Sequence, residues 1–183
     1  QDQDDVFELY LVNLATPGTS TKLNGVLVAG GDVVQFAVTP DGSSVVYRAD
    51  QNIDEVFELF RTVFVGLVRS QLNPVYGLSQ DLETFVILPD STGAIYRADQ
   101  DTDGVSELYR VLFATAPATN RLVNPPLLAG QNVAAFAVTP DSANVVYIAN
   151  RPIGTNQVFI VRAGGGGSIQ LNGVLVANGN VTA

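Results

Sequence analysis

The chain lacks cysteine, histidine, methionine and tryptophan altogether, and Lys22 is its single lysine. Without cysteine or histidine, it cannot form the usual zinc sites, a histidine-dependent serine triad or a thiol nucleophile. Runs of roughly 18 apolar residues are also missing, so no membrane insertion is predicted. These absences remove the common catalytic centres, and we therefore expect a protein that is not an enzyme.

Positive charge is scarce as well, with 18 acidic against 9 basic residues and a net charge of −9. Such a surface repels phosphate backbones and anionic lipids, so neither nucleic acid nor a membrane surface is a predicted partner. Apolar residues make up 46% of the 183 positions, enough for a sizeable core. Abundant valine and the lack of long Glu-, Lys- or Arg-rich stretches favour strands over helices.

A repeat of about 50 residues organises the chain. Similar tripeptides recur as KLN (22–24), QLN (71–73), RLV (121–123) and QLN (170–172), at spacings of 49, 50 and 49 residues. Three longer segments lie between them: FAVTPDGSSVVYRADQ (36–51), FVILPDSTGAIYRADQ (85–100) and FAVTPDSANVVYIANR (136–151). Short segments then follow in the same phase, among them VFELF (56–60) and VSELY (105–109), and VFELY (6–10) opens the chain.

Each repeat divides into four short strands. In the first full repeat we expect strands at 33–39, 44–49 and 55–63 and a fourth around 71–75, with a turn at Pro40-Asp41-Gly42. Four antiparallel strands in about 50 residues predict an all-β fold, a β-propeller of four-stranded blades. The expected division is a partial blade (1–30), three full blades (31–78, 79–128 and 129–176) and the start of another (177–183). A sandwich of unrelated hairpins is the alternative.

These motifs carry a family resemblance. An aromatic residue, then Pro-Asp-Gly/Ser, Tyr-x-Ala-Asp, an acidic loop and Glu-Leu-Tyr resemble the repeat of TolB-like, WD-repeat-like β-propellers. The resemblance covers nearly the whole chain and implies six or more blades and a role in binding partners. The same type of blade also occurs beside the catalytic domain of prolyl-oligopeptidase-like enzymes. The third full repeat departs from the pattern after Tyr147.

The acidic loop after the second strand is a candidate calcium site. In residues 99–107, oxygen ligands fall at loop positions one, three, five, seven (a backbone carbonyl) and nine: Asp99, Asp101, Asp103, Val105 and Glu107. Gly104, at position six, lets the backbone curl around an ion, and calcium accepts six to eight oxygens in tolerant geometry. The spacing resembles the DxDxDG hairpins of integrin-α propellers. It differs from an EF-hand, because Arg110 stands at position twelve.

Two other copies of this loop keep some of the same ligands. The candidates are Asp50, Asn52, Asp54 and Glu58 in the first full repeat, and Asp2, Asp4 and Glu8 at the N-terminus. Glu55 replaces the glycine of position six, at a cost of roughly 1 kcal/mol for a left-handed turn. The alternative is that all these loops are ordinary hairpin turns, in which Asp, Asn and Gly are the preferred residues. Arg48 and Arg97 would then neutralise them without a metal.

Other residues that recur in every repeat are expected to be structural. The aspartates after proline should accept hydrogen bonds from nearby backbone amides: Asp41, Asp90 and Asp141. The aromatic residues of the first strand are expected in the core: Phe36, Phe85 and Phe136. The tyrosines of the second strand are expected between blades: Tyr47, Tyr96 and Tyr147. None of these sets points to a ligand cage.

The functional prediction is a secreted or surface propeller that serves as a structural or protein-interaction module with calcium-stabilised loops. A chain without methionine that starts at Gln1 and carries partial blades is expected to be a fragment of a larger propeller, or to associate with a protein partner or with copies of itself. An extracellular, cell-surface or periplasmic bacterial location is expected. The alternatives are the regulatory propeller of a prolyl-oligopeptidase-like peptidase and a self-assembling extracellular fibre subunit.

Overall fold

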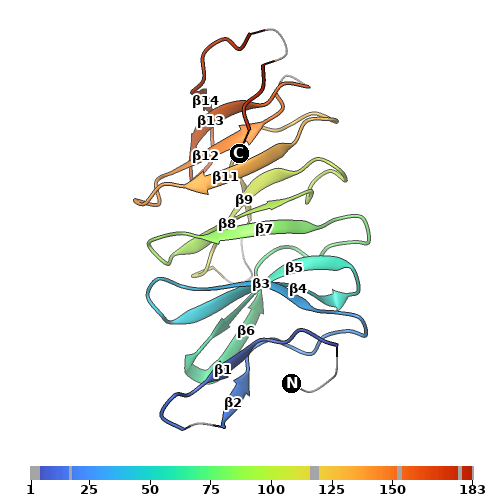
Figure 1. Cartoon of the computed structure of the whole chain (residues 1–183), viewed down its shortest axis with the longest axis vertical. Coiled ribbons are helices and arrows are strands. Elements are labelled where there is room, and N and C mark those ends of the chain that lie inside the picture. Colours follow the sequence, from blue (N-terminus) through green and yellow to red (C-terminus); the bar gives the residue numbers. More distant parts are fainter. Residues whose placement is uncertain (1–4, 17, 116–119, 152–153, 177–178, 183) are drawn as a thin grey trace.

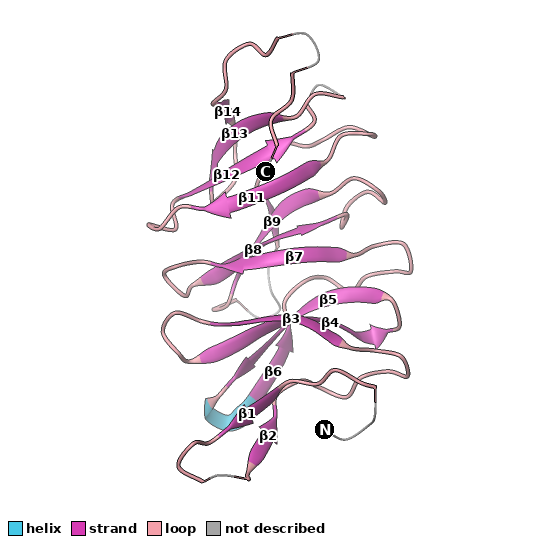
Figure 2. Cartoon of the chain, viewed as in Figure 1, coloured by secondary structure: helices cyan, strands magenta, loops and turns pink. Residues whose placement is uncertain are grey.

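The computed structural model describes residues 5–16, 18–115, 120–151, 154–176 and 179–182. These residues form strands joined by turns, and a single 3-10 turn, η1 (Val65–Leu67), is the helical element of this part of the chain (Figure 2). Three four-stranded sheets and one two-stranded sheet are present, all antiparallel. This confirms the predicted all-β fold of four-stranded blades. No helix among the described residues is long and apolar enough to cross a membrane.

The sheets follow one another in chain order. The two-stranded sheet contains β1 (Tyr10–Val12) and β2 (Ser20–Lys22). The second sheet contains β3 (Val33–Val38), β4 (Ser44–Ile53), β5 (Val56–Val63) and β6 (Val68–Gln71). The third contains β7 (Leu82–Ile87), β8 (Gly93–Ala98), β9 (Glu107–Leu112) and β10 (Arg121–Leu122). The fourth contains β11 (Val133–Val138), β12 (Asn144–Ala149), β13 (Gln157–Arg162) and β14 (Ile169–Gln170).

The three four-stranded sheets are built alike. In each, the strands pair in sequential order. The first strand of each carries a register shift near its start, and Phe36 pairs with Tyr47 as Phe85 pairs with Tyr96. The sheets succeed one another along the long axis of the molecule and form an open row in the described part of the chain (Figure 1). A sandwich of dissimilar hairpins is therefore ruled out.

Each pair of neighbouring sheets encloses an apolar core. Leu9 and Leu23, which flank the strands of the first sheet, join Tyr47 of the second, and Val46 and Leu59 join Tyr96 of the third. The last core brings residues of the third and fourth sheets together around Tyr147. The three tyrosines are at most 1% exposed. Each stacks on an aromatic ring of the neighbouring third strand, with centroids 5.3–5.5 Å apart. Their predicted position between blades is confirmed.

The prediction for the first-strand phenylalanines is wrong at one position. Phe85 is 3% exposed and Phe136 packs against the last core, but Phe36 is 61% exposed. The reason lies in the preceding sheet. β7 packs against β4 and β5, whereas only β1 and β2 precede β3 among the described strands. Phe36 therefore lacks the second strand that would cover it.

The fourth strand also ends earlier than predicted. It was expected around 71–75, but β6 ends at Gln71, and the Leu-Asn pair that follows lies outside the strand. Hydrogen bonds also correct the alignment of the repeats. Val123 donates to the Leu108 carbonyl as Leu72 donates to that of Leu59, so Val123 corresponds to Leu72. The tripeptide equivalent to QLN is therefore LVN (122–124) rather than RLV.

Candidate functional site

The acidic hairpin between β8 and β9 has the backbone conformation that its sequence predicts. Gly104, at loop position six, has φ 70°, and the equivalent Glu55 has φ 63°. Asp5 and Gly154 occupy the same place in the first and last sheets, with φ 60° and 84°. A left-handed residue at this place is thus common to all four loops, whatever its side chain. The conformation alone does not require a metal.

The aspartate at the first loop position accepts hydrogen bonds that stabilise the fold. Asp99 Oδ1 accepts a hydrogen bond from the Asp81 amide (2.6 Å) and Oδ2 accepts one from the Gly104 amide (3.1 Å). In the previous sheet, Asp50 accepts equivalent bonds from the Asp32 (2.6 Å) and Glu55 (3.1 Å) amides. These bonds tie the hairpin to the residue that leads into the first strand of the same sheet.

The ninth position is a buried glutamate that points away from the loop tip. Glu107 Oε1 accepts hydrogen bonds from the Leu127 amide (2.8 Å) and from Asn124 Nδ2 (3.2 Å). Burial raises the pKa of Glu107, and the Leu127 amide partly offsets this effect by stabilising the carboxylate. The carboxylate thereby fixes the segment that follows the fourth strand.

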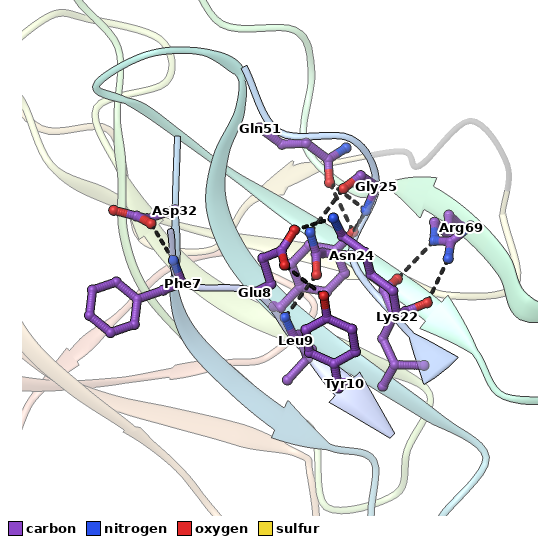
Figure 3. Close-up of polar contacts among 12 residues, drawn as sticks. Phe7, Glu8, Leu9, Tyr10, Lys22, Asn24, Gly25, Asp32, Gln51 and Arg69 are labelled. Atoms are coloured by element: carbon purple, nitrogen blue, oxygen red, sulfur yellow. Dashed lines mark hydrogen bonds and ion pairs between the residues drawn. The ribbon is translucent and has the colours of Figure 1, made fainter. Parts of the chain in front are cut away.

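The two equivalent glutamates, Glu58 and Glu8, also have polar partners. Glu58 accepts bonds from Gln71 Nε2 (2.7 Å) and from Asn52 Nδ2 (2.6 Å). Glu8 forms an ion pair with Lys22 and accepts a bond from the Tyr10 hydroxyl (Figure 3). All three glutamates therefore have partners within the fold.

The structure places the remaining predicted ligands in different surroundings. Asp101 and Asp103 lie in the exposed turn, whereas Val105 is buried. Asn52 turns its amide nitrogen toward Glu58, and Asp54 is exposed. Asp2 and Asp4 lie outside the described residues. No group of three or more acidic side chains within the described ranges is arranged to hold a metal ion. Calcium binding therefore stays a prediction.

The asparagine of the recurring tripeptide has a role that the sequence reasoning missed. Its side-chain oxygen accepts a hydrogen bond from a third-strand amide at 2.7–2.8 Å in all four sheets. The residues are Asn24, Asn73, Asn124 and Asn172, and the donors are Leu9, Leu59, Leu108 and Val158. Each asparagine also donates to the carbonyl of the next residue. Its exact recurrence in the repeat was the available signal.

A second recurring bond joins one sheet to the next. A side-chain oxygen just before a first strand accepts a bond from an amide in or next to the third strand of the preceding sheet, at 2.6–2.9 Å. The donor–acceptor pairs are Phe7–Asp32, Phe57–Asp81, Ser106–Asn132 and Asn156–Asn180. Figure 3 shows the first pair together with the bond from Leu9 to Asn24. Two of these acceptors are aspartates and two are asparagines, so an oxygen is needed at this position but a charge is not.

The Pro-Asp turns also contact their neighbours. As predicted, the aspartates accept bonds from backbone amides: Asp41 from Ser43, Asp90 from Thr92 and Asp141 from Ala143, each at 3.0 Å. In addition, the Asp41 amide donates to the Ser91 hydroxyl and the Asp90 amide donates to the Ser142 hydroxyl, both at 3.0 Å. The serines that replace Gly42 of the first turn therefore join successive sheets.

The two arginines before the acidic loops point toward the next sheet. Arg48 donates to the Leu82 carbonyl, and its guanidinium lies 4.0 Å from the centroid of the Phe57 ring. Arg97 donates to the Val133 (3.2 Å) and Ala134 carbonyls and pairs with Glu83 at 2.5 Å. The polar residues that recur in this chain thus stabilise each sheet and also fasten it to the next one.

Comparison with solved structures agrees with this architecture. TolB from Acinetobacter baumannii matches with a TM-score of 0.56 and 19% identity, over 92% of this chain and 38% of that one. A puromycin-hydrolysing peptidase of Mycobacterium tuberculosis matches with a TM-score of 0.65 and 14% identity, over 91% of this chain and 26% of that one. The chain has the TolB-like β-propeller fold.

Further matches are of the same two kinds. A putative TolB from Agrobacterium tumefaciens gives a TM-score of 0.57 at 16% identity, over 89% of this chain and 55% of that one. A prolyl endopeptidase gives 0.61 at 16% identity, over 86% of this chain and 25% of that one. This chain thus spans between 25% and 55% of the length of these proteins. No family model matches the chain, and no curated protein matches it.

Proposed function

We propose that this propeller is a non-enzymatic structural and protein-interaction module, acting at an extracellular, cell-surface or periplasmic location as part of a larger propeller or an assembly. The supporting observation is the outer face of β3. There Val34, Phe36 and Val38 are 47%, 61% and 53% exposed, side by side on one face of the strand. Contiguous exposed apolar side chains mark surfaces that bind other proteins. Calcium bound at the predicted loops would stiffen the hairpins formed by the second and third strands of each sheet.

A capture experiment tests this proposal. The immobilised chain and a variant with Val34→Ser and Phe36→Ser would be exposed to proteins of the source cell, and the bound proteins would be quantified by mass spectrometry. We expect the wild type to enrich a defined protein that the variant loses. Equal capture by both would contradict binding through this face. Cleavage of proline-containing peptides by the purified chain would contradict the non-enzymatic assignment.

The alternative is the regulatory propeller of a prolyl-oligopeptidase-like enzyme. It is favoured by the likeness to the two peptidases, with TM-scores of 0.65 and 0.61. The sequence that flanks this segment in its parent gene separates the two functions. An adjoining α/β domain with a Gly-x-Ser-x-Gly motif would support the peptidase. Further repeats would support the interaction module. Fibres seen by electron microscopy would indicate the second alternative, a self-assembling subunit.

A further inference from the structure

Two arginines stand opposite each other on the last two strands of the third sheet. Arg110 of β9 pairs in register with Arg121 of β10. Side chains at directly opposite positions of antiparallel strands share one face of the sheet, with Cβ atoms about 5 Å apart, and like charges placed there destabilise the pair. At the equivalent place in the second sheet, Arg61 pairs with Ser70. The third sheet therefore carries two positive charges where the second carries one.

In the second sheet, Arg61 has partners within the fold. Its Nε donates a hydrogen bond to the Ser44 hydroxyl at 2.9 Å. Its guanidinium lies 4.5 Å from the centroid of the Phe113 ring, which the third sheet supplies. An acceptor and an aromatic ring together satisfy a partly buried guanidinium. No further ligand is needed at this place.

Arg110 occupies the same place in the third sheet, but the residues around it differ. By strand register, Gly93 stands where the second sheet has Ser44, so the hydroxyl acceptor is missing. By backbone hydrogen bonding, Ala163 of the fourth sheet corresponds to Phe113, so the ring is missing too. Arg110 Nε is buried and has no hydrogen-bond partner in the part of the chain that the structure describes. A buried donor in this position calls for an acceptor from outside the chain.

A cavity of about 390 Å³ lies at the two guanidiniums. It is lined by Arg110, Leu112, Asn120, Arg121 and Gly164. Two glycines bring the fourth sheet close to the charges: a Cβ added at Gly164 would lie 3.8 Å from Arg110 Nη1, and one added at Gly165 would lie 3.5 Å from Arg121 Nε. The volume falls within the range of about 300–1,000 Å³ that is usual for small-ligand sites.

The charge of this site fits a small anion with two negative charges. Within the described ranges, no carboxylate forms an ion pair with Arg110 or Arg121. Guanidinium groups offer planar forks of N–H donors that match the oxygens of phosphate and carboxylate. A phosphate group carries about 1.5–2 negative charges at neutral pH, which balances two arginines, whereas a carboxylate carries one. The net charge of −9 repels polyanions, so the ligand has to be small.

We propose that Arg110 and Arg121, with the adjoining glycines at 164–165, form a binding site for a phosphate group, either the free ion or a phosphomonoester. The two guanidiniums donate to its oxygens, and Arg110 Nε gains the acceptor that Ser44 supplies to Arg61. The bound anion also removes the repulsion between the paired arginines. This site lies between the third and fourth sheets, apart from the outer face of β3, and goes beyond the proposed function.

The test is a titration of the purified chain with inorganic phosphate, in phosphate-free buffer at constant ionic strength. The Nε–Hε resonance of Arg110 is followed by NMR. We expect a saturable shift, one ion per chain and a Kd of about 1 mM or lower, together with a rise in Tm. Acetate, with its single charge, should bind at least about 10-fold more weakly. Equal binding of acetate and phosphate would overturn the assignment.

A second probe distinguishes the two sources of the phosphate group. Phosphoserine presents the same oxygens on an organic molecule. Tighter binding of phosphoserine than of inorganic phosphate would assign the site to a phosphomonoester. Tighter binding of inorganic phosphate would assign it to the free ion. Either result supports the site, and failure of both probes to bind would overturn it.

Matched variants show whether the two arginines bind the ion. Arg121→Gln should weaken phosphate binding about 10-fold or more, whereas Arg61→Gln, which removes a guanidinium with its own partners, should leave it unchanged. Gly164→Glu should abolish binding while both arginines stay in place, because its carboxylate reaches Arg110 from a position where a Cβ has room. Gly164→Gln, its uncharged match, should keep most of the binding.

Stability gives a readout that does not depend on added phosphate. Without phosphate, the Gly164→Glu chain should have a higher Tm than the Gly164→Gln chain, because its carboxylate takes the place of the ion between the arginines. Circular dichroism establishes that each variant keeps the wild-type fold. Equal Tm and equal phosphate binding in these two chains, or equal losses in Arg61→Gln and Arg121→Gln, would overturn the proposal. The capture experiment addresses the outer face of β3, so its failure would leave this site standing.

Discussion

The carboxylate of Asp99 accepts a hydrogen bond from the backbone amide of Asp81 at 2.6 Å, across the base of the acidic hairpin. Asp50 holds Asp32 in the same way, and Asn150 does so for Asn132 with only an amide oxygen. The position therefore requires a hydrogen-bond acceptor rather than a negative charge. A residue that looks like a metal ligand in the sequence thus already has a structural role.

Substitution of Asp99 separates these two roles. Asp99→Asn keeps an oxygen for the Asp81 amide and should cost less than about 1 kcal/mol of unfolding free energy. Asp99→Ala leaves that amide without its partner and should cost about 1–3 kcal/mol. Urea unfolding in the presence of a calcium chelator measures both values. Equal losses in the two variants would contradict the structural role of the oxygen.

Calcium should stabilise the hairpin if the predicted ligands bind it. Asp101 and Asp103 are two residues apart in the exposed turn, and like charges that converge on one site repel in the absence of a cation. We expect the Tm to rise with calcium and fall with chelator, and Asp101→Ala to lose this response. Thermal unfolding monitored by circular dichroism provides the measurement. An unchanged Tm in both directions would leave only a hairpin turn.

Phe36 and Phe85 form a matched pair for testing whether the outer face of β3 is exposed. Their backbones occupy equivalent places, but Phe36 is 61% exposed and Phe85 is 3% exposed. Phe85→Ala should therefore lower the unfolding free energy by about 3–5 kcal/mol, and Phe36→Ala by less than about 1 kcal/mol. Both values come from chemical denaturation of the purified chain. A loss at Phe36 as large as that at Phe85 would mean that this face is covered.

The Pro-Asp turn of the third sheet should make the unfolding free energy depend on pH. Hydrogen bonds from the Thr92 amide and hydroxyl hold the pKa of Asp90 below its ordinary value of 3.8. A lowered pKa means that the folded state favours the carboxylate, so this stabilisation is present above pH 3.8 and is lost as the pH falls through the lowered value. Asp90→Asn should therefore be less stable than the wild type at neutral pH, by no more than about 1 kcal/mol, since the turn is exposed.

Comparing the two proteins across the pH range isolates this group. The difference in unfolding free energy should shrink as the pH falls below 3.8 and through the lowered pKa of Asp90, where the carboxylate becomes protonated. Thr92→Val, which removes the hydroxyl donor and keeps the amide, should give a smaller loss with the same dependence. A difference that stays constant from neutral to acid pH would show that the charge of Asp90 contributes nothing.

The fold could be predicted because the same strand and turn pattern recurs in each full repeat. Segments such as FAVTPDGSSVVYRADQ and FVILPDSTGAIYRADQ specify the same two strands and the same turn, and a chance pattern does not recur in phase. The tyrosines between blades and the turn aspartates followed from the same recurrence. Features shared by all repeats are those that the fold requires.

The candidate site was harder to predict, because the surroundings of its residues depend on how the neighbouring strands and sheets are placed. Phe36 has the same sequence context as Phe85, and only the neighbouring strands decide its exposure. The role of Glu107 was also hidden, since its partners, Asn124 and the Leu127 amide, are brought close by the fourth strand. The acidic spacing in the sequence describes a possible set of ligands, whereas the fold decides where each side chain points.

Disulfide trapping tests the central claim, that equivalent sheets lie side by side, most directly. The chain has no cysteine of its own, and the Asp41 amide lies 3.0 Å from the Ser91 hydroxyl in the next sheet. A chain with Asp41→Cys and Ser91→Cys should form an intramolecular disulfide on mild oxidation, detected by mass spectrometry after digestion. Asp41→Cys with Ser142→Cys, two sheets apart, should not. Trapping of both pairs alike, or of neither, would contradict the account.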